Sequence, residues 1–195
     1  MRPNVCISHP EPVQYGRLGE LILLVDRYIY PPMLGSCATA GSVMEMLMNI
    51  PNSPFAPEHI KIASIGDTVA GVIVSYGSPF SEMPDLSAFC DSPCVPVSCK
   101  HVCDYYLTHM LESLKDGETY IACIATDPDF RGQGIASALI ENVLSESDGK
   151  NASLDVLCDN ANAIRLYEKY GFEIVGETTG YAYDEEPPKV YQMRR

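Results

Sequence analysis

Hydrophobic and polar residues recur along this chain with two different periods, and each period predicts one type of element. A period near 3.6 predicts helices over 17–29 and 38–49, each with an apolar stripe on one side. The prolines at 31–32 are expected to end the first helix, because proline cannot continue it. Two β-rich runs flank the Gly-Asp pair at 66–67, and this pattern is typical of a hairpin over 60–77.

The second half of the chain predicts a regular alternation of strands and helices. The run "TYIACIAT", which ends at Thr126, is apolar at nearly every position and is expected to lie inside a sheet with both faces covered. Strand, helix and strand in alternation indicate an α/β fold around a central sheet. The remaining predicted elements are strands at 4–8, 152–158, 172–182 and 188–193, and helices at 104–114, 133–146 and 161–170.

Composition places these elements in one soluble domain. The chain has 195 residues, of which 46% are hydrophobic and 20% charged, as in ordinary globular proteins. We expect a single domain over 1–195, with an irregular, proline-rich loop inserted at about 78–103. No signal peptide and no membrane-spanning run is recognisable, so a cytoplasmic protein without a membrane partner is expected.

Charge and cysteine content narrow the expected partners. The formal net charge of −13 speaks against a nucleic-acid partner and favours a cationic one. Eight cysteines without a secretion signal indicate a reducing compartment and free thiols. Four of them, Cys90, Cys94, Cys99 and Cys103, lie close together, but their spacing differs from the Cys-x-x-Cys of structural zinc sites. Free thiols and no metal are expected there, with zinc or disulfides as alternatives.

The stretch "DPDFRGQGIASALI" (127–140) joins the strand to the predicted helix and carries two glycines. A triphosphate loop would need Lys and Ser or Thr after Gly134, and a dinucleotide loop would need a third glycine where Ser137 stands. Two interpretations remain. The free amides of the helix N-terminus and Arg131 would bind a pyrophosphate, or the glycines only shape a turn.

Two linked motifs decide between these interpretations, because together they strongly resemble the GNAT superfamily of acyl-coenzyme A N-acyltransferases. The first is similar to the pyrophosphate loop of that family, as Arg131, Gly134 and Ala136. The second is similar to its Asn-x-x-Ala signature, as Asn160, Ala163, Ile164, Tyr167, Gly171 and Phe172. The resemblance is close over about 118–180, whereas 1–77 match only in element order.

The resemblance implies a fold and a cosubstrate. The fold would be a mixed central sheet of six to seven strands, flanked by helices and splayed between its two central parallel strands. The cosubstrate would be acetyl-coenzyme A (acetyl-CoA), and no metal is implied. Its pantetheine arm would pair with the strand end, and its pyrophosphate would lie at the helix mouth. The residues so assigned are Ile124, Ala125 and Thr126, then Arg131, Gly132, Gln133, Gly134, Ile135 and Ala136, and finally Asn160, which could equally be only a helix cap.

Two residues are candidates for catalysis. By resemblance, Tyr167 would protonate the leaving thiolate, and its ordinary pKa near 10 suits that role. Many family members carry a glutamate base on the strand before the loop, but "TYIACIAT" has no carboxylate. Asp155 on the next strand is the candidate base, because partial burial would raise its pKa. A purely structural Asp155 and a water chain to solvent stay open as alternatives.

The activity implied is transfer of an acetyl group to a primary amine of a small molecule or peptide, by direct attack in a ternary complex. The acceptor cleft would involve the turn at 28–34 and the loop at 78–103. A second copy of the chain, in a homodimer, is an open partner. The alternative function is a non-catalytic coenzyme A-binding sensor or interaction module of the same fold.

Overall fold

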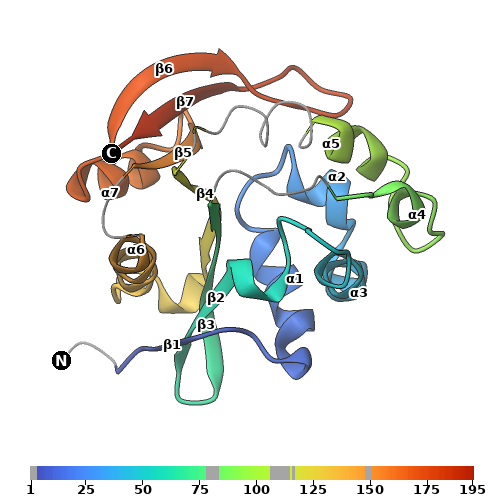
Figure 1. The fold of residues 1–195 in the computed structure, drawn as a ribbon, viewed down its shortest axis with the longest axis horizontal. Coiled ribbons are helices and arrows are strands. Elements are labelled where there is room, and N and C mark those ends of the chain that lie inside the picture. Colours follow the sequence, from blue (N-terminus) through green and yellow to red (C-terminus); the bar gives the residue numbers. More distant parts are fainter. Residues whose placement is uncertain (1–3, 78–83, 106–114, 116, 148–150) are drawn as a thin grey trace.

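The fold is built around a seven-stranded sheet with the order β1-β2-β3-β4-β5-β7-β6 (Figure 1). The structure is a computed structural model that describes residues 4–77, 84–105, 115, 117–147 and 151–195. The strands are β1 (Cys6–Ser8), β2 (Ile60–Ile65), β3 (Thr68–Gly77), β4 (Thr119–Thr126), β5 (Ala152–Leu157), β6 (Glu173–Thr179) and β7 (Lys189–Arg194). The predicted strands and the hairpin over 60–77 are thereby confirmed, apart from small shifts at their ends.

Helices cover both faces of this sheet. Figure 1 shows α6 and α7 on one side of it and α1, α2 and α3 on the other. Among the described residues no helix is long and apolar enough to cross a bilayer. The α-helices are α1 (Tyr15–Ile22), α2 (Tyr30–Leu34), α3 (Cys37–Met48), α4 (Ser87–Cys90), α5 (Cys99–Tyr105), α6 (Ile135–Glu146) and α7 (Ala161–Lys169), and short 3-10 helices span Pro12–Gln14, Pro57–His59 and Pro128–Phe130.

The centre of the sheet holds one parallel pair of strands, β4 and β5, while every other recorded pair is antiparallel. Pairing of β4 with β5 runs only from Thr119–Ile121 against Ala152–Leu154. Beyond this point β4 continues to pair with β3 and β5 with β7, so the two central strands separate. The mixed α/β sheet with splayed central strands, expected from the resemblance, is confirmed.

Close packing of α6 onto the sheet sets the position of the loop before it. Gly71 lies on β3 opposite this helix, and a Cβ atom there would stand 2.6 Å from Ile135 Cγ2 and 2.9 Å from the Ala125 carbonyl oxygen. Only glycine therefore lets α6 approach at this distance. Ile135 and Leu139 are fully or almost fully buried in the resulting core, which fixes the first turn of the helix.

The expected helix over 17–29 is too long, because α1 ends at Ile22. Residues after it form turns, in which the Asp26 carboxylate accepts a hydrogen bond from the Tyr28 amide at 2.6 Å. Such local side-chain bonds compete with helix formation. Pro31 and Pro32 do not end a helix as expected. They occupy the first turn of α2, where a missing N–H costs no helical hydrogen bond.

The inserted segment at 78–103 is also more ordered than expected, since its described part contains α4 and most of α5. Residues 78–83 lie outside the described residues. The helix predicted over 104–114 overlaps the structure only at 104–105, the end of α5, and 106–114 lie outside the described residues. The sequence pattern did not predict these helices, because α4 has only four residues and α5 only seven, and both lie in a proline-rich segment.

Candidate functional site

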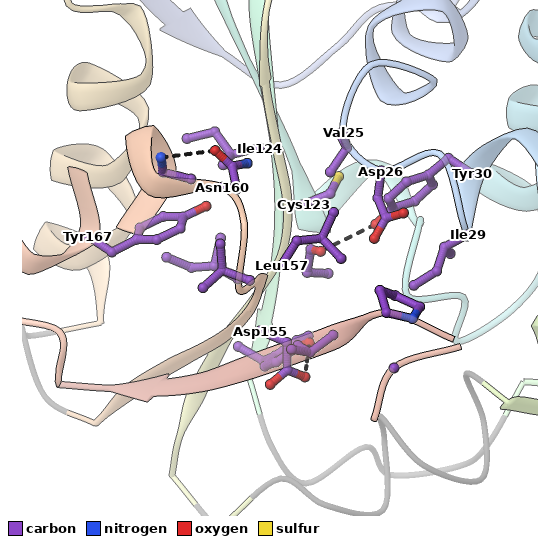
Figure 2. Close-up of a pocket in the computed structure, with 18 of the residues that line it drawn as sticks. Val25, Asp26, Ile29, Tyr30, Cys123, Ile124, Asp155, Leu157, Asn160 and Tyr167 are labelled. Atoms are coloured by element: carbon purple, nitrogen blue, oxygen red, sulfur yellow. Dashed lines mark hydrogen bonds between the residues drawn. The ribbon is translucent and has the colours of Figure 1, made fainter. Parts of the chain in front are cut away.

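A cavity of about 220 Å³ opens where β4 and β5 separate. Figure 2 shows it with Ile124 and Cys123 from β4 in the centre, Tyr167 and Asn160 on one side, and Asp26 and Tyr30 on the other. We call it the strand-split cavity. Ligands of open α/β sheets commonly bind at the carboxyl ends of such strands, so the topology itself marks this position.

A second hollow, a groove of about 490 Å³, lies at the N-terminus of α6. We call it the α6 groove. Its walls come from the end of β4, the loop before α6, the first turn of α6, and α7. The groove and the strand-split cavity share four lining residues, Thr126, Ala136, Ala163 and Leu166. The two spaces therefore adjoin, and together they can hold a long ligand with an anionic part and a thin arm.

The loop that leads into the groove is fixed by Asp127, which directly follows β4. Its carboxylate accepts a hydrogen bond from the Asp129 amide at 2.8 Å and forms an ion pair with Arg17 of α1. Its own amide donates to the Ala70 carbonyl at 2.9 Å. Pro128 then begins a 3-10 helix, where the lack of an N–H is tolerated. Asp127 is 8% exposed, so these contacts are partly shielded from water.

Two glycines turn the backbone amides of this loop outward. Gly132 and Gly134 have φ angles of +74° and +89°, in the left-handed region that side chains disfavour. Within the described residues, no backbone or side-chain acceptor is recorded for the amides of 132–136. These amides and the positive end of the α6 dipole can together interact favourably with an anion, and Arg131 lines the same groove. The chain thus fits the pyrophosphate of acetyl-CoA.

The strand end assigned to the pantetheine arm lies at the junction of the two spaces. Ile124 and Thr126 line the strand-split cavity, whereas the Ala125 side chain is buried and does not line it. Thr126 Oγ1 is buried and has no hydrogen-bond partner among the described residues. An unpaired buried hydroxyl is costly, and a polar group of a bound ligand would satisfy it. The Gln133 side chain lines neither of the two spaces. Its Nε2 atom donates a hydrogen bond to the Asp129 carbonyl at 3.4 Å.

Tyr167 reaches the strand-split cavity from α7, as Figure 2 shows. Only 6% of the residue is exposed, and its ring packs edge-on against Phe172 with 5.9 Å between ring centroids. Burial raises the pKa of the Tyr167 phenol well above the ordinary value near 10 that was expected from the sequence, so the phenol stays protonated but is a weaker acid than expected. Within the described residues no hydrogen bond to this phenol is recorded, which leaves the group available to a ligand.

Asn160 is the N-cap residue of the same helix, which confirms that it acts as a helix cap. Its side-chain oxygen accepts a hydrogen bond from the Ala163 amide at 3.2 Å, which satisfies one of the free amides of the first turn. The residue also lines the strand-split cavity, where its side-chain NH₂ can donate to a ligand. Cap and ligand contact are compatible, because each uses a different atom. Gly171 ends α7 with a φ angle of +80°.

Asp155 lies on β5 in the wall of the strand-split cavity (Figure 2). Tyr120 of β4 donates a hydrogen bond from its hydroxyl to Asp155 Oδ2 at 2.9 Å. Burial raises the pKa of the Asp155 carboxyl, and this effect outweighs the Tyr120 hydrogen bond and the charge of Arg194, which both lower it. Asp155 on β5 and Tyr167 on α7 therefore line the same cavity.

Among the polar residues that line this cavity, sequence reasoning gave no functional role to Asp26 and Tyr120. Asp26 lines it from the turn before α2, and burial also raises the pKa of its carboxyl. The expected helix over 17–29 gave Asp26 no special position, and only the turn brings it to the cavity. Tyr120 was counted as one apolar residue of a strand, although its hydroxyl positions Asp155. Tyr105 lies near both acids, whose charges add to burial in raising the pKa of its phenol.

Comparison with known proteins agrees with this geometry. Residues 45–172 match the Acetyltransferase (GNAT) family. The chain is 45% identical over 65 residues to the mycothiol acetyltransferase of Brachybacterium faecium, covering 32% of this chain and 19% of that protein. It is 40% identical over 63 residues to the L-amino acid N-acetyltransferase AaaT of Escherichia coli, covering 30% of this chain and 39% of that protein.

A solved N-acetyltransferase from Staphylococcus aureus Mu50 is similar over 97% of this chain and 100% of its own, with a TM-score of 0.69 and 22% identity. This likeness supports the fold alone. The sequence match to the two curated relatives covers well under half of each of them. The family match is broader, because it extends over most of the residues from α3 to the end of α7. The chain therefore belongs to the Acetyltransferase (GNAT) family.

Proposed function

We propose that this protein is an N-acetyltransferase that moves the acetyl group of acetyl-CoA to a primary amine of a small molecule or peptide. One observation carries the proposal. The separation of β4 and β5 creates a cavity that adjoins the α6 groove and contains both a buried tyrosine and a partly buried aspartate. Family membership and the names of the relatives, which describe acetyltransferases, support the same activity.

In this proposal the cosubstrate lies along the two adjoining spaces. The amides of 132–136 and Arg131 hold the pyrophosphate, and the unpaired edge of β4 at 124–126 faces the arm. Asn160 contributes its side-chain NH₂. When bound, acetyl-CoA supplies the activated acetyl thioester. The chain itself supplies orientation, exclusion of water and two groups that handle protons.

The charge of the strand-split cavity favours an amine acceptor. Its described lining includes two carboxylates, Asp26 and Asp155, and five tyrosines, but no Lys, Arg or His. A protonated amine entering this cavity gains a favourable charge interaction and hydrogen-bond acceptors. An anionic acceptor would meet two like charges with reduced screening, because both acids are partly buried. The relative that is named for acetylating L-amino acids is consistent with an amine of this kind.

Two residues would carry the proton transfers. Asp155 has a raised pKa, which makes its ionised form a stronger base than an exposed aspartate, so it accepts a proton from the ammonium group of the acceptor. Tyr167 keeps its phenolic proton throughout the neutral range and donates it to the departing thiolate. Asp26 is the second acid in reach of the cavity and helps to hold the cationic acceptor.

Release of free thiol from acetyl-CoA in the presence of amines tests this proposal. The panel should contain L-amino acids, aliphatic diamines and short peptides with free N-termini, with the corresponding N-blocked compounds as matched controls. We expect thiol release with at least one free amine and none with its blocked form. If coenzyme A binds in calorimetry but no amine in a broad panel is acetylated, the non-catalytic sensor is the better description.

A further inference from the structure

Three cysteine thiols lie close together where α4 and α5 approach each other, outside the proposed acetyl-CoA site. Cys90 is the last residue of α4, while Cys99 and Cys103 begin successive turns of α5. The three sulfur atoms all lie within 4.8 Å of one another, and Cys99 Sγ is 3.7 Å from Cys103 Sγ. Cys99 and Cys103 are buried and Cys90 is half-buried, and all three are free thiols. We call this group the thiol triad.

From this geometry we propose that the thiol triad binds a thiophilic divalent cation, with Zn²⁺ as the expected ion. In tetrahedral zinc sites the Zn–S distance of about 2.3 Å places two sulfur ligands about 3.8 Å apart. The 3.7 Å between Cys99 Sγ and Cys103 Sγ matches this separation without any movement of α5. A third sulfur in reach of both completes one face of a tetrahedron.

Sequence spacing argued against a metal here, and the tertiary structure changes that expectation. The zinc knuckle that the sequence lacks takes both cysteines from one tight turn. In this chain, the helical spacing of four residues brings Cys99 and Cys103 to one face of α5, and the packing of α4 adds Cys90. Packing thus brings the sulfur atoms of three of the four cysteines into one cluster. The fourth, Cys94, is exposed and is not part of the triad.

The surroundings support three sulfur ligands and one open position. His101 lies two residues from each triad member on α5, hence on the other side of the helix, where its ring is 5.5 Å from that of Tyr183. Water or an external ligand would therefore take the fourth position. Asp104 follows Cys103 directly, and the chain carries a net charge of −13, so the local field favours a cation.

The proton balance of binding follows from the chemistry of thiols. Each of the three thiols loses its proton when its sulfur bonds to Zn²⁺, so up to three protons are released for each ion bound. Affinity should consequently fall as the pH is lowered. No electron transfer takes place, and the site acts by joining α4 to α5. These helices, of four and seven residues, are too short to be stable alone.

A metal at the triad would also stabilise one wall of the strand-split cavity. α5 ends at Tyr105, which lines that cavity, and α5 packs against α2, which begins with Tyr30 of the same lining. The ion would thus hold the acceptor side of the cavity without touching the reacting atoms.

Zinc binding by the full-length protein, purified and assayed under a metal-free reductant, tests the proposal without acetyl-CoA. We expect one zinc ion per chain in equilibrium dialysis, and Co²⁺ in its place should give thiolate charge-transfer absorption. Cys90→Ser should lose this binding, whereas the matched control Cys94→Ser should keep it. Reduced wild-type protein that takes up no zinc, or Cys90→Ser that still binds one ion with unchanged absorption, would overturn the proposal.

If Cys90→Ser does not fold, judged by circular dichroism, the wild-type protein still decides. X-ray absorption of the zinc-loaded chain should then count three sulfur ligands, and a count of none or one would reject the triad. Thermal unfolding gives an independent reading, because an ion that binds only the folded chain raises the melting temperature as its concentration rises. This shift should appear in wild type and in Cys94→Ser. A melting temperature that does not respond to zinc contradicts the proposal.

Discussion

Replacing Tyr167 by phenylalanine separates its catalytic role from its structural role more sharply than any other change in this site. The substitution removes one oxygen atom and keeps the ring, and therefore also the edge contact with Phe172 at 5.9 Å. Within the described residues, no internal hydrogen bond to the phenol is recorded. A structural tyrosine with these contacts would lose almost nothing when it becomes phenylalanine.

The expected magnitudes differ strongly between stability and rate. Losing a buried hydroxyl that has no internal partner changes the free energy of unfolding by less than about 1 kcal/mol, and the change can be stabilising. Losing the general acid lowers kcat by about 10²-fold or more, which corresponds to about 2.7 kcal/mol or more of transition-state stabilisation. Coenzyme A binding should change little, since the α6 groove does not include Tyr167.

The assay compares three quantities for the wild type and for Tyr167→Phe, namely kcat from thiol release, Kd for coenzyme A from calorimetry, and the melting temperature. Tyr170→Phe is the matched control. It removes a hydroxyl three residues later on the same segment, where Tyr170 bonds to the exposed Glu141 carboxylate at 2.7 Å. We expect a large loss of kcat only for Tyr167→Phe. Unchanged kcat, or a loss explained by unfolding, would refute the role of Tyr167 as the acid.

Four further predictions concern Asp155 and its hydrogen-bond partner, the loop before α6, and the contact of α6 with the sheet. Tyr120→Phe removes the hydrogen bond that lowers the pKa of Asp155, so this pKa rises and the acid limb of the pH–rate profile moves to higher pH. Asp155→Asn should abolish that limb and most of the activity, as seen in rate profiles from pH 5 upward. Gly134→Ala imposes about 1–2 kcal/mol of strain, because the φ of this residue is +89°. The loop should shift to relieve this strain, and the displaced amides should raise Kd for coenzyme A by about tenfold. Gly71→Ala should lower the free energy of unfolding by about 1–3 kcal/mol, because the new Cβ meets Ile135 and the Ala125 carbonyl.

Gly71→Ala has a matched control, and contradicting results are defined for three of these predictions. Gly77→Ala, at the end of the same strand as Gly71, places its Cβ in open space and should leave the chemical denaturation midpoint nearly unchanged. Equal losses for both glycines would show that α6 does not approach as closely as described. An acid limb that stays in place in Tyr120→Phe would mean that Asp155 is not the titrating base. Unaltered coenzyme A affinity in Gly134→Ala would remove the amides of the loop from the pyrophosphate site.

Ionisation of the two partly buried acids, Asp26 and Asp155, affects the stability of the folded chain. The pKa of Asp155 and that of Asp26 are both raised in the folded chain, so folding is favoured most where these groups are protonated. As the pH rises through these raised pKa values, each ionisation costs folding free energy. At neutral pH such a cost is expected of groups kept for binding or catalysis rather than for stability.

The sequence alone determined the parts of this protein that depend on local order along the chain. β4, α6, β5 and α7 were predicted because their apolar periods are long and their ends carry clear signals, such as Asn160 at the start of α7. The segment at 131–136 was found because its arginine and both glycines lie within four successive residues. The same locality explains the errors. The turn after α1 depends on a side-chain bond from Asp26, and α4 and α5 are shorter than the window over which a helical period can be recognised.

Only the tertiary structure decided which distant residues meet. The chain separates Asp26 from Asp155 by more than half its length, yet both line one cavity, because β4 and β5 diverge just where α2 and α7 approach from opposite sides of the sheet. The thiol triad arose in the same way, since a helical turn and a neighbouring helix selected three sulfurs that the sequence spaced unfavourably. Periodicity records which side of an element is buried. It does not record which element covers that side, and this contact is what brings two acids, a tyrosine and three thiols together into sites.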